Sequence, residues 1–585
     1  MVYNEENFQG GGIMRIKDVE QRTGLTRKSI RFYEAKGLLN VKRSENTYRD
    51  YDEEIIFRLQ TIALLRQAGV SISDIQLWQD KVLTLDELLH KRIGELKDHR
   101  DLAADQISLC HSILSDGINT LLTRTRDTEA LPEEEDSEEL PKDTQLCLGL
   151  DIGTTTLSAV ILNLTDGSLI SAYTIPSNAD LPGDHPWEKC QDVEIIENRV
   201  IRLVNALLDR FRGVQAIGLT GQMHGILYLD RQNRPCSPLF TWQDGRAGQG
   251  NPSTCDQLLH ETGLPISAGY GLATHCHLAR TGTLPADAVK LCTIMDYLAW
   301  KLSDFSQPLM HASNAASLGF FQPEIHNFDQ NALKIAGISS TFLPEVTVKH
   351  TILGTCRGIP VTVAIGDNQA SFLSTVSHPD RMALANFGTG SQISLMTDTY
   401  FPGDGDIENR PFLDRTCLVS GSALCGGRAY ALLERFFRSF IGSDEQQYEI
   451  LNRLALQGLE RSSLPEIRTT FCGTRRHPNL RGQILELGED NFTPEAFAAG
   501  TLLGMAQELL DMYSRMPHEN IRELVASGNA IRKNPALKLA LERVFGMNVR
   551  IPKHREEAAF GAAMFAALAS GLRSLPQLQQ SCIHY

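Results

Sequence analysis

The spacing of apolar residues divides the chain into two parts. From Ile16 to about Leu114, apolar side chains recur at intervals of three and four residues, which predicts a series of helices. Beyond residue 145, short apolar runs that reach a glycine, such as 147–153, 216–221 and 361–367, alternate with longer helical stretches. This alternation predicts an α/β architecture.

An acidic segment lies between the two parts. Residues 129–143 include the sequence LPEEEDSEELPKD, in which prolines flank a block of carboxylates. Such a block cannot bury a core, so it predicts a solvated linker, which we place over 119–144. A polar, glycine-rich tail over 1–13 precedes the first patterned segment.

A short pattern occurs twice in the second part. Leu150–Leu162 and Ala385–Met396 each contain an apolar run, a turn rich in glycine and threonine, and a second apolar run. Two such hairpins predict two related α/β domains, over 145–380 and 381–585, that face each other. The backbone N–H groups of paired turns of this kind suit a polyphosphate ligand.

Two short helices around Gly24 predict a helix-turn-helix. Thr26 suits the N-cap of the second helix, and Gly37 lies just beyond its end. A basic, turn-rich hairpin follows, which predicts a wing that touches phosphates through Arg43 and Arg49. The exposed basic side chains that would enter a major groove are Arg27, Lys28 and Arg31.

A resemblance to the MerR family of transcriptional regulators is carried by the segments IRFYEAKGLL, SENTYRDYD and RLQTIALLRQAGVSISDIQ, over roughly the first 115 residues. The resemblance implies an all-α winged helix-turn-helix over 14–83 that binds double-stranded promoter DNA. It also implies a dimerisation helix over 84–118. The residues that it places at the DNA are Thr26, Arg27, Lys28, Arg31, Tyr33, Arg43, Tyr48 and Arg49.

The helix expected over 84–118 carries apolar residues at coiled-coil spacing. Together with the family resemblance, this spacing predicts a homodimer on a pseudo-palindromic DNA site. The alternative is a helix of an intramolecular core. Metal-sensing members of the family carry paired cysteines here, whereas Cys110 stands alone, so we do not expect metal sensing. The residues of the spacing are Leu89, Ile93, Leu96, Ala103, Ile107, Cys110 and Leu114, with Arg100 in one core position.

The second part contains no GxxxxGK[ST] loop, so nucleotide binding there cannot use a Walker lysine. The first hairpin offers backbone and hydroxyl donors to phosphate, and Asp151 beside them can hold hydrated Mg²⁺. In the second hairpin Asn386 replaces that aspartate, which predicts a single metal site. A tight turn without chemistry is the alternative for either hairpin. The candidate phosphate-binding residues are Gly153, Thr154, Thr155, Gly388, Thr389, Gly390 and Ser391.

Phosphoryl transfer to an alcohol also requires a base beside the attacking oxygen. The candidate is Asp367 in AIGDNQAS, a carboxylate at the end of an apolar run and the start of a helix. This position suits a catalytic base, and by position alone it suits a helix N-cap equally well.

The order of these features resembles the FGGY family of carbohydrate kinases, over essentially all of 145–575. The resemblance implies two actin-like, ribonuclease H-like domains that use ATP and Mg²⁺, with the sugar bound by 145–380 and ATP by 381–585. It implies that Asp367 takes the proton of the sugar hydroxyl. It also implies an adenosine loop in VASGNAIRKNPAL, with Gly528, Asn529 and Asn534.

Two further segments, LTGQMHGILYLD and TWQDGRA, resemble the sugar site of ketose-phosphorylating members of that family, such as sedoheptulokinases and xylulokinases. Without the resemblance, His224 and Trp242 would be assigned to the core. The stretches GYGLATHCHL and SNAASLGFF favour a seven-carbon ketose first and xylulose second. The substrate residues that the resemblance implies are Gln222, Met223, His224, Trp242, Asp244 and Arg246.

Composition narrows the class of protein. With 585 residues, 42% hydrophobic and 22% charged, the chain has the composition of a globular protein of three or four domains. Its net charge of −15 excludes a protein that coats nucleic acid along its whole length, although Arg15–Val70 is locally basic. The twelve cysteines form no CxxC pair, and we find no signal-peptide or membrane-spanning pattern. We therefore expect reduced thiols and a cytoplasmic location.

These features together predict a ketose kinase fused to a dimeric, DNA-binding regulator. A regulator that uses the kinase fold as a sugar sensor without turnover is the alternative. The presence of Asp151, Asp367 and both phosphate hairpins speaks against it. A kinase whose DNA-binding part has lost its role is a third possibility, which the basic helix and hairpin disfavour.

Overall fold

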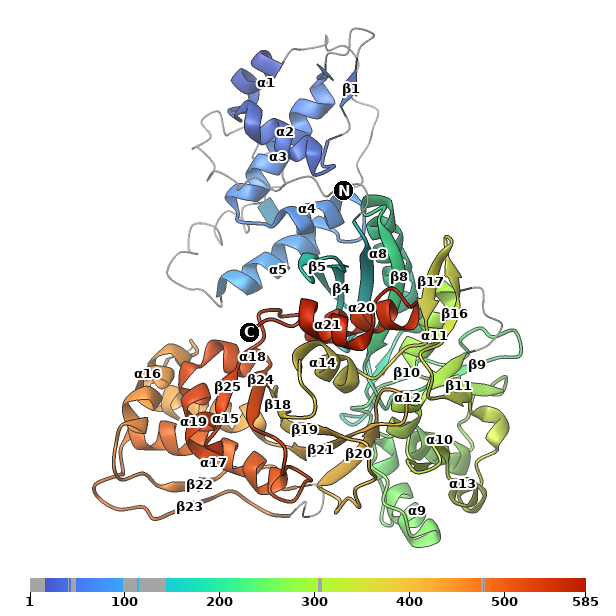
Figure 1. Cartoon of the computed structure of the whole chain (residues 1–585), viewed down its shortest axis with the longest axis vertical. Coiled ribbons are helices and arrows are strands. Elements are labelled where there is room, and N and C mark those ends of the chain that lie inside the picture. The colour runs from blue at the N-terminus through green and yellow to red at the C-terminus, as the bar shows by residue number, and fades with distance from the viewer. Residues whose placement is uncertain are drawn as a thin grey trace. The chain divides into compact units, whose positions relative to one another are not determined.

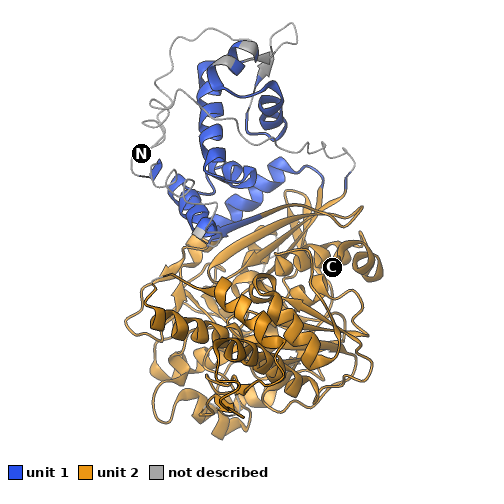
Figure 2. Cartoon of the chain, turned by 90° about the vertical axis from the view of Figure 1, so that its left-hand side faces the viewer, with its two compact units in different colours: residues 1–144, 173–176, 197–213 blue, residues 145–172, 177–196, 214–585 orange. Residues whose placement is uncertain are grey.

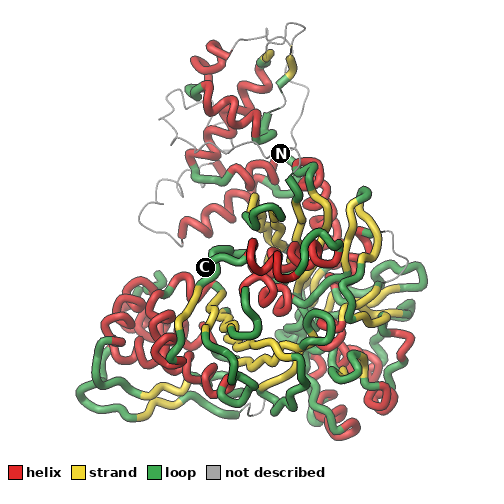
Figure 3. The backbone as a smooth tube through the Cα atoms, in the orientation of Figure 1, coloured by secondary structure: helices red, strands yellow, loops and turns green. Residues whose placement is uncertain are grey.

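The computed structural model describes residues 16–39, 41–43, 49–97, 113–114, 144–303, 308–443, 445–474, 477 and 479–585. The chain forms two compact units (Figure 2). Unit 1 consists of residues 1–144, 173–176 and 197–213, and unit 2 consists of residues 145–172, 177–196 and 214–585. The described part of unit 1 is mainly helical, whereas unit 2 mixes strands and helices (Figure 3).

Unit 1 begins with short helices and a two-stranded hairpin. They are α1 (Ile16–Thr23), α2 (Arg27–Ala35), β1 (Lys42–Arg43), β2 (Arg49–Asp50), α3 (Glu53–Gln67), α4 (Ile72–Gln79) and α5 (Leu85–Lys97). The side chains of Thr26, Asp52 and Ser71 each accept a hydrogen bond from a backbone N–H in the first turn of α2, α3 and α4. These caps fix where the three helices start.

The turn between α1 and α2 confirms the predicted helix-turn-helix. Gly24 has a φ of +71° there, and Gly37 has a φ of +72° after α2, a region that suits glycine. Strands β1 and β2 pair antiparallel, with Lys42 opposite Asp50, at the place of the predicted wing. The turn of that hairpin, 44–48, lies outside the described residues, so the wing stays a prediction.

Helix α5 covers the first part of the helix that was predicted to dimerise. Leu89, Ile93 and Leu96 are already buried within a single chain, where α5 packs on α4. This burial is what an intramolecular core helix requires. Residues 98–112, which hold Arg100, Ala103, Ile107 and Cys110, lie outside the described residues, and the homodimer stays a prediction.

Unit 1 also contains most of α8 (Val193–Arg210). Arg199 Nη2 donates to Glu87 Oε1 at 2.6 Å, and Arg210 Nη2 donates to Asp80 Oδ2 at 2.6 Å. The Arg199 and Glu87 side chains are 19% and 16% exposed. Solvent screens an ion pair less when its side chains are less exposed. The Arg199–Glu87 ion pair is therefore stronger than the Arg210–Asp80 ion pair.

A six-stranded sheet has the order β16-β17-β8-β3-β4-β5. Its strands are β3 (Leu146–Ile152), β4 (Thr156–Asn163), β5 (Leu169–Pro176), β8 (Val214–Gly221), β16 (Ile352–Cys356) and β17 (Ile359–Thr362). Strand β3 pairs antiparallel with β4 and parallel with β8, so that Asp151 lies between Ser158 and Thr220. The first predicted hairpin is therefore the centre of this sheet.

A second six-stranded sheet has the order β20-β21-β19-β18-β24-β25. Its strands are β18 (Met382–Phe387), β19 (Ser391–Thr397), β20 (Ile407–Pro411), β21 (Cys417–Ala423), β24 (Glu523–Ser527) and β25 (Asn548–Arg550). Strand β18 pairs antiparallel with β19 and parallel with β24. Both sheets thus contain a hairpin whose first strand lies parallel to a later strand, which confirms the predicted repeat.

Helix α20 (Glu557–Ala569) packs on the first sheet and on α14 (Asp367–Thr375), although it comes late in the chain (Figure 1). A Cβ on Gly149 would lie 1.9 Å from the Ala559 carbonyl oxygen, and one on Gly218 would lie 2.0 Å from that of Ala562. The helix can approach the strands so closely only because glycine has no side chain. The range 381–585 therefore includes a helix that belongs to the first sheet in space.

Shorter elements surround the sheets. The strands are β6 (Asp180–Leu181), β7 (Cys190–Gln191), β9 (Leu227–Leu229), β10 (Leu239–Phe240), β11 (Lys290–Cys292), β12 (Leu309–His311), β13 (Phe321–Gln322), β14 (Asn327–Phe328), β15 (Glu345–Thr347), β22 (Glu466–Arg468) and β23 (Gln483–Leu485). The helices are α9 (Thr254–Thr262), α10 (Gly271–Thr281), α11 (Ile294–Leu302), α12 (Ala312–Ser317), α13 (Gln330–Ala336), α15 (Gly426–Ile441), α16 (Tyr448–Leu459), α17 (Pro494–Tyr513), α18 (Asn529–Lys533), α19 (Pro535–Phe545) and α21 (Leu575–Cys582), with 3-10 turns at Arg246–Gly248 and Ser340–Phe342. Helices α17 and α19 share one core with β18, β19 and β24.

No helix within the described ranges is long and apolar enough to cross a membrane. Every cysteine within these ranges carries a free thiol.

Candidate active site

The turn of the first hairpin joins two groups of predicted site residues. Thr154 Oγ1 donates to Gln222 Oε1 at 3.3 Å and accepts a hydrogen bond from Trp242 Nε1 at 3.1 Å. Gln222 is buried, and its Nε2 donates to Gln191 Oε1 at 2.9 Å. Gln191 Nε2 donates in turn to the backbone oxygen of Thr154 at 2.7 Å. The predicted phosphate turn and the predicted sugar residues therefore share one hydrogen-bonded corner.

The predicted base lies beside the residue that follows Gln222. Asp367 is the first residue of α14, and the N-cap is Gly366, so the alternative role of Asp367 as an N-cap is excluded. A Cβ on Gly366 would lie 2.8 Å from Met223 Sδ, and Asn368 Nδ2 donates to the same sulfur at 3.7 Å. Met223 thus packs against the residues on both sides of Asp367.

Burial and neighbouring charges shift the pKa values of two carboxyl groups. Burial raises the pKa of Asp367 to about 6, against the opposing effect of the Arg410 cation. Burial also raises the pKa of Asp151 to about 7, and the negative charges of Asp367 and Glu556 add to that rise. The charge of Asp367 therefore acts on Asp151 in addition to burial. A carboxylate with a pKa near 6 is ionised at neutral pH and still basic enough to accept a proton.

His224 has a backbone φ of +72°, which is uncommon for a residue other than glycine. Its backbone N–H donates to Ser317 Oγ at 3.1 Å, and its Nδ1 lies 2.7 Å from the Ser317 carbonyl oxygen. Because a carbonyl can only accept, Nδ1 carries a proton. The ring stacks on Tyr270, with centroids 4.7 Å apart. These contacts hold the imidazole half-exposed beside Met223 instead of in the core.

The segment after β10 presents an aromatic face. Trp242 is 48% exposed, which excludes the core role that its type alone suggests. Asp244 is 0% exposed, and its carboxylate accepts from the Lys189 backbone N–H at 3.0 Å and from Arg246 Nε at 2.6 Å. The predicted contact of Asp244 with a ligand is therefore corrected, because protein donors already occupy this buried carboxylate. The Asp244–Arg246 pair holds the segment that carries Trp242.

Helix α15 begins directly on the turn of the second hairpin. The Gly427 backbone N–H donates to the Gly388 carbonyl oxygen at 3.0 Å. A Cβ on Gly426 would lie 2.3 Å from the carbonyl carbon of Gly390, and one on Gly427 would lie 2.5 Å from the Gly388 oxygen. Gly388 and Thr389 stay exposed. An exposed glycine turn at the start of a helix offers backbone donors to an anion, so this turn fits a phosphate.

The predicted adenosine loop follows β24, the parallel neighbour of β18. Gly528 has a φ of +95°, and a Cβ there would lie 2.4 Å from the Phe387 carbonyl oxygen. Asn529 begins α18 and is exposed, next to the second turn. Asn534 is buried, and its Oδ1 accepts from the Ala536 backbone N–H at 3.0 Å. The side chain of Asn534 therefore caps α19 and supports the loop from within.

The other predicted phosphate and metal residues lie where the two hairpins turn. A Cβ on Gly153 would lie 2.8 Å from the Thr156 carbonyl oxygen, Thr155 is exposed, and Ser391 is buried at the start of β19. The described residues contain no group of three or more side chains that could hold a metal ion by themselves. One carboxylate, Asp151, fits Mg²⁺ that keeps most of its waters and binds the phosphates of a ligand.

Unit 1 presents part of the predicted DNA-contacting set. Thr26 caps α2 by accepting from the Ser29 backbone N–H, and Arg27, Lys28 and Arg31 are exposed along that helix. Arg27 Nε also donates to Glu20 Oε2 at 2.6 Å, which orients its guanidinium. The side chains of Arg43, Tyr48 and Arg49 lie outside the described residues.

Tyr33 departs from the predicted set. It is 1% exposed and packs edge-to-face with Phe32, with ring centroids 5.7 Å apart. An aromatic ring this deeply buried belongs to the core of unit 1, so the predicted DNA contact of Tyr33 is corrected.

Several residues at the site were not predicted. They are Gln191, Tyr270, Arg410, Gly426 and Gly427. The pair of glycines has a sequence signal, because CGGRA begins a helix directly after a strand. Tyr270 stands in GYGLATHCHL, a stretch that the family resemblance already singled out. Gln191 and Arg410 have no such signal, since each reaches the site from an element distant in sequence.

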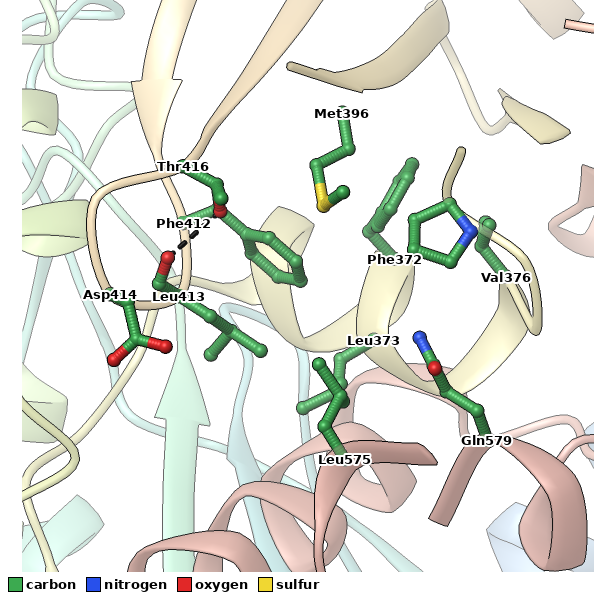
Figure 4. A pocket seen from close by; sticks show the side chains of 11 residues that line it. Phe372, Leu373, Val376, Met396, Phe412, Leu413, Asp414, Thr416, Leu575 and Gln579 are labelled. Carbon is green, nitrogen blue, oxygen red and sulfur yellow. Dashed lines mark hydrogen bonds between the residues drawn. The ribbon is translucent and has the colours of Figure 1, made fainter. Parts of the chain in front are cut away.

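An apolar pocket of about 170 Å³ lies at the other end of α14 from Asp367 (Figure 4). Phe372 and Leu373 of α14 line it together with Val376, which follows the helix, and Phe412 and Leu575 face them. A helix rises about 1.5 Å per residue, so this pocket is on the order of 10 Å from Asp367. Its lining is mostly apolar, with Asp414, Thr416 and Gln579 at its border, and it is not part of the candidate site.

Two known protein families match the chain. The FGGY family of carbohydrate kinases matches with its N-terminal domain over residues 146–374 and with its C-terminal domain over residues 384–570. The MerR HTH family regulatory protein matches over residues 14–81. The two FGGY matches together span well over half of the chain.

Individual relatives and solved structures resemble the same part. The chain is 25% identical to sedoheptulokinase of Mus musculus over 465 residues, which are 71% of this chain and 96% of the relative. It is 22% identical to xylulose kinase of Staphylococcus xylosus over 450 residues, 72% of this chain and 90% of the relative. The crystal structure of xylulose kinase from Rhodospirillum rubrum superimposes with a TM-score of 0.65 at 19% identity, over 75% of this chain and 93% of that one, and shows the fold.

Proposed function

Because the chain belongs to the FGGY family of carbohydrate kinases and carries a MerR-type helix-turn-helix, we propose that it phosphorylates a ketose with ATP and binds promoter DNA. Sedoheptulose is the first candidate acceptor and xylulose the second, in keeping with the relatives. The observations that carry the proposal are the hydrogen bond from Thr154 to Gln222 and the packing of Met223 against the residues on both sides of Asp367, because these contacts join the phosphate turn, the sugar residues and the base.

The residues that would hold MgATP come from both sheets. They are Asp151, through water, Gly153, Thr154, Thr155, Gly388, Thr389, Gly390, Gly528 and Asn529. When bound, Mg²⁺ neutralises charge on the phosphates during transfer. The absence of side chains at Gly388 and Gly390, and at Gly426 behind them, leaves the backbone of the second turn open to phosphate oxygens.

Asp367 accepts the proton of the attacking ketose hydroxyl. The bond from that oxygen to the γ-phosphorus forms as the bond to the bridging oxygen of ATP breaks, ADP leaves, and Asp367 returns its proton to water. Trp242 offers its exposed face to the sugar, and Gln222 and His224 orient its hydroxyl groups. The half-exposed indole and the buried amide of Gln222 are joined through Thr154, so sugar and phosphate are positioned by the same turn.

Turnover on a panel of sugars tests the kinase. The purified chain is incubated with MgATP and sedoheptulose, xylulose, ribulose or glycerol, and ADP release is measured. We expect turnover on sedoheptulose and less on xylulose. If calorimetry shows sugar binding and no sugar supports ADP release, the chain is instead a sugar sensor that uses a kinase fold.

We propose further that the occupied kinase alters DNA binding. The support is the pair of ion pairs inside unit 1, Arg199–Glu87 and Arg210–Asp80, which join α8 to the helices that follow the helix-turn-helix. Helix α8 leads directly into β8, and Gln222 follows the end of β8. A movement at the sugar-binding end of β8 therefore has a covalent route to contacts of unit 1.

A DNA titration tests this coupling. Fluorescent duplex DNA from upstream of the coding region is titrated with the chain, with and without sedoheptulose plus a non-hydrolysable ATP analogue. We expect the ligands to change the affinity for DNA, and Arg199→Gln to reduce that change several-fold. Arg202→Gln, at an exposed position on the same helix, is the control. Equal affinities with and without ligands would contradict the coupling and leave the kinase proposal intact.

A further inference from the structure

We propose that Arg410 is a positioning residue for the reaction: it brings a cation from the second sheet to Asp367 and links this base to the His224–Tyr270 stack. The inference rests on the proposed kinase function and assigns a residue that neither the sequence pattern nor the comparisons indicate. Three observations carry it, and they concern the burial of Arg410, the anchoring of its strand and the partner that it shares.

Arg410 is a buried cation. It lies on β20, the edge strand of the second sheet, and is 7% exposed. Its Nε donates to Glu408 Oε1 at 3.0 Å, and its Nη1 donates to Gln392 Oε1 at 3.2 Å. A buried guanidinium is costly unless each donor has a partner or an anion faces it. An arginine on the surface would avoid that cost, so the burial of Arg410 indicates that its cation has a specific role at this place.

Strand β20 is anchored directly to the helix that begins with the base. Gln369 lies two residues after Asp367, and its Nε2 donates to the Pro411 carbonyl oxygen at 2.9 Å. Pro411 follows Arg410. This bond fixes the end of β20 against the start of α14, and the positive charge of Arg410 lowers the pKa of Asp367 against the larger effect of burial.

Arg410 opposes the effect of burial on the candidate base. The negative charges of Asp367 from α14 and of Glu556, just before α20, raise the pKa of Asp151 from β3 beyond the effect of burial. Arg410 from β20 is the cation that acts on Asp367. It therefore favours the ionised carboxylate, which is the form that can accept a proton from an alcohol.

Glu408 connects Arg410 to the predicted sugar segment. Tyr270 Oη donates to Glu408 Oε2 at 3.4 Å, while Glu408 Oε1 accepts from Arg410. Tyr270 also stacks on His224. A continuous path of contacts thus runs from His224 through Tyr270 and Glu408 to Arg410. The side chains that would orient the sugar and the cation that acts on the base are held by one carboxylate.

The pH profile separates positioning from a merely structural role. Because the Arg410 cation lowers the pKa of Asp367, Arg410→Gln moves the acid limb of kcat/KM to higher pH. We expect kcat/KM for the ketose to fall roughly two- to tenfold at pH 7 and to recover nearly to the wild-type value at pH 9. Arg410→Lys keeps the cation and retains most of the wild-type profile.

Arg468 provides a matched control. It follows Glu466 by two residues on β22, as Arg410 follows Glu408 on β20, and its Nε donates to Glu466 Oε1 at 2.8 Å. Its side chain is 56% exposed. Arg468→Gln should leave the pH profile unchanged. An equal loss of activity for Arg410→Gln at every pH, or an unchanged profile, would overturn the proposal.

A stability cycle tests the same electrostatic effect without turnover. Melting temperatures are measured between pH 5 and pH 8.5 for the wild type, Arg410→Gln, Asp367→Asn and the double variant. Because Arg410 stabilises ionised Asp367, its removal should lower the melting temperature more at pH 8.5 than at pH 5, and Asp367→Asn should abolish that difference. If the difference persists in the double variant, Arg410 does not act on Asp367. This result stands even if no sugar is turned over.

Discussion

Asp367 raises the pKa of Asp151 across the candidate site. Burial is the larger cause of that rise, which takes the pKa of Asp151 to about 7, and the charge of Asp367 adds to it. One aspartate ends the first strand of a hairpin and the other begins α14. The charge of Asp367 thus disfavours ionisation of Asp151, and a bound Mg²⁺ would offset this effect.

Replacing the base should abolish transfer and stabilise the fold. Asp367→Asn removes the proton acceptor, so we expect kcat to fall by about 10² to 10⁴ or more with sugar binding retained. Because burial disfavours the ionised carboxylate, we also expect a higher melting temperature at pH 7.5. ADP release, calorimetry and thermal unfolding measure the three effects. Asp380→Asn, at an exposed position, is the control. An active Asp367→Asn variant would show that another group is the base.

The activity of the wild-type chain should decline on the acid side. Burial raises the pKa of Asp367 from the usual 3.8 to about 6, and only the deprotonated form can accept a proton. We therefore expect kcat/KM to fall about tenfold per pH unit below pH 6. The contribution of the two aspartates to stability should change with pH in the direction opposite to kcat/KM. Both aspartates have raised pKa values in the fold, so their contribution to stability grows as pH falls through 7 and 6. A flat kcat/KM between pH 5 and pH 7 would contradict the assignment.

A single methyl group at the second turn should impair nucleotide binding. A Cβ on Gly426 would lie 2.3 Å from the carbonyl carbon of Gly390, so Gly426→Ala must displace the turn. We expect the Kd for ADP to rise by about tenfold or more while sugar binding changes little. Gly94→Ala is the control, because a Cβ at Gly94 meets no atom within 4 Å and alanine favours a helix. Calorimetry with ADP measures the effect, and equal affinities for both variants would exclude this turn from the nucleotide site.

Trp242 should act on sugar affinity without supporting the core. Because Trp242 is 48% exposed, removing its side chain leaves no large cavity. Trp242→Ala should therefore raise KM for the ketose several-fold and change the melting temperature little. Trp242→Phe keeps an aromatic face and loses the hydrogen bond to Thr154. An intermediate KM for the phenylalanine variant would separate these two contributions. A large loss of stability in either variant would assign Trp242 a structural role.

Exposed arginines of α2 should govern the salt dependence of DNA binding. Arg31→Ala should reduce the slope of log K against log salt by about 1, since each phosphate contact releases counterions. Arg58→Ala, whose arginine pairs with Glu54 on the surface of α3, is the control.

Tyr33→Ala should instead lower the free energy of unfolding by about 3 to 5 kcal/mol, because its ring is buried. If the free energy of unfolding of Tyr33→Ala equals that of the wild type, the assignment of Tyr33 to the core is wrong.

Features set by neighbouring residues were predictable. Gly24 and Gly37 adopt the positive φ values that the helix-turn-helix requires, and Thr26 caps α2 as its side chain predicts. The two hairpins also follow from local patterns of apolar and turn residues. Chain neighbours decide these features, so the same residues produce them wherever the element lies.

Burial of individual polar and aromatic side chains was not predictable in the same way. Tyr33 and Asp244 stand in segments that carry real site candidates, yet both are buried and serve the core or a loop. Arg410 shows the converse, since its sequence context suggests nothing and its strand delivers it to Asp367. Neighbours distant in sequence decide burial and charge, and a one-dimensional pattern does not contain them.

By itself, the sequence determined the kinds of elements, the repeat of the hairpin and the identity of the chemical groups, since local propensities and turn geometry depend on adjacent residues. Only the tertiary structure decided that Thr154 joins Gln222 and Trp242 at the first turn, that α20 returns to the first sheet through Gly149 and Gly218, and that α15 closes the second turn through Gly426. Those relationships depend on packing between distant segments, where the room left by a missing side chain and the field of a remote charge set the outcome.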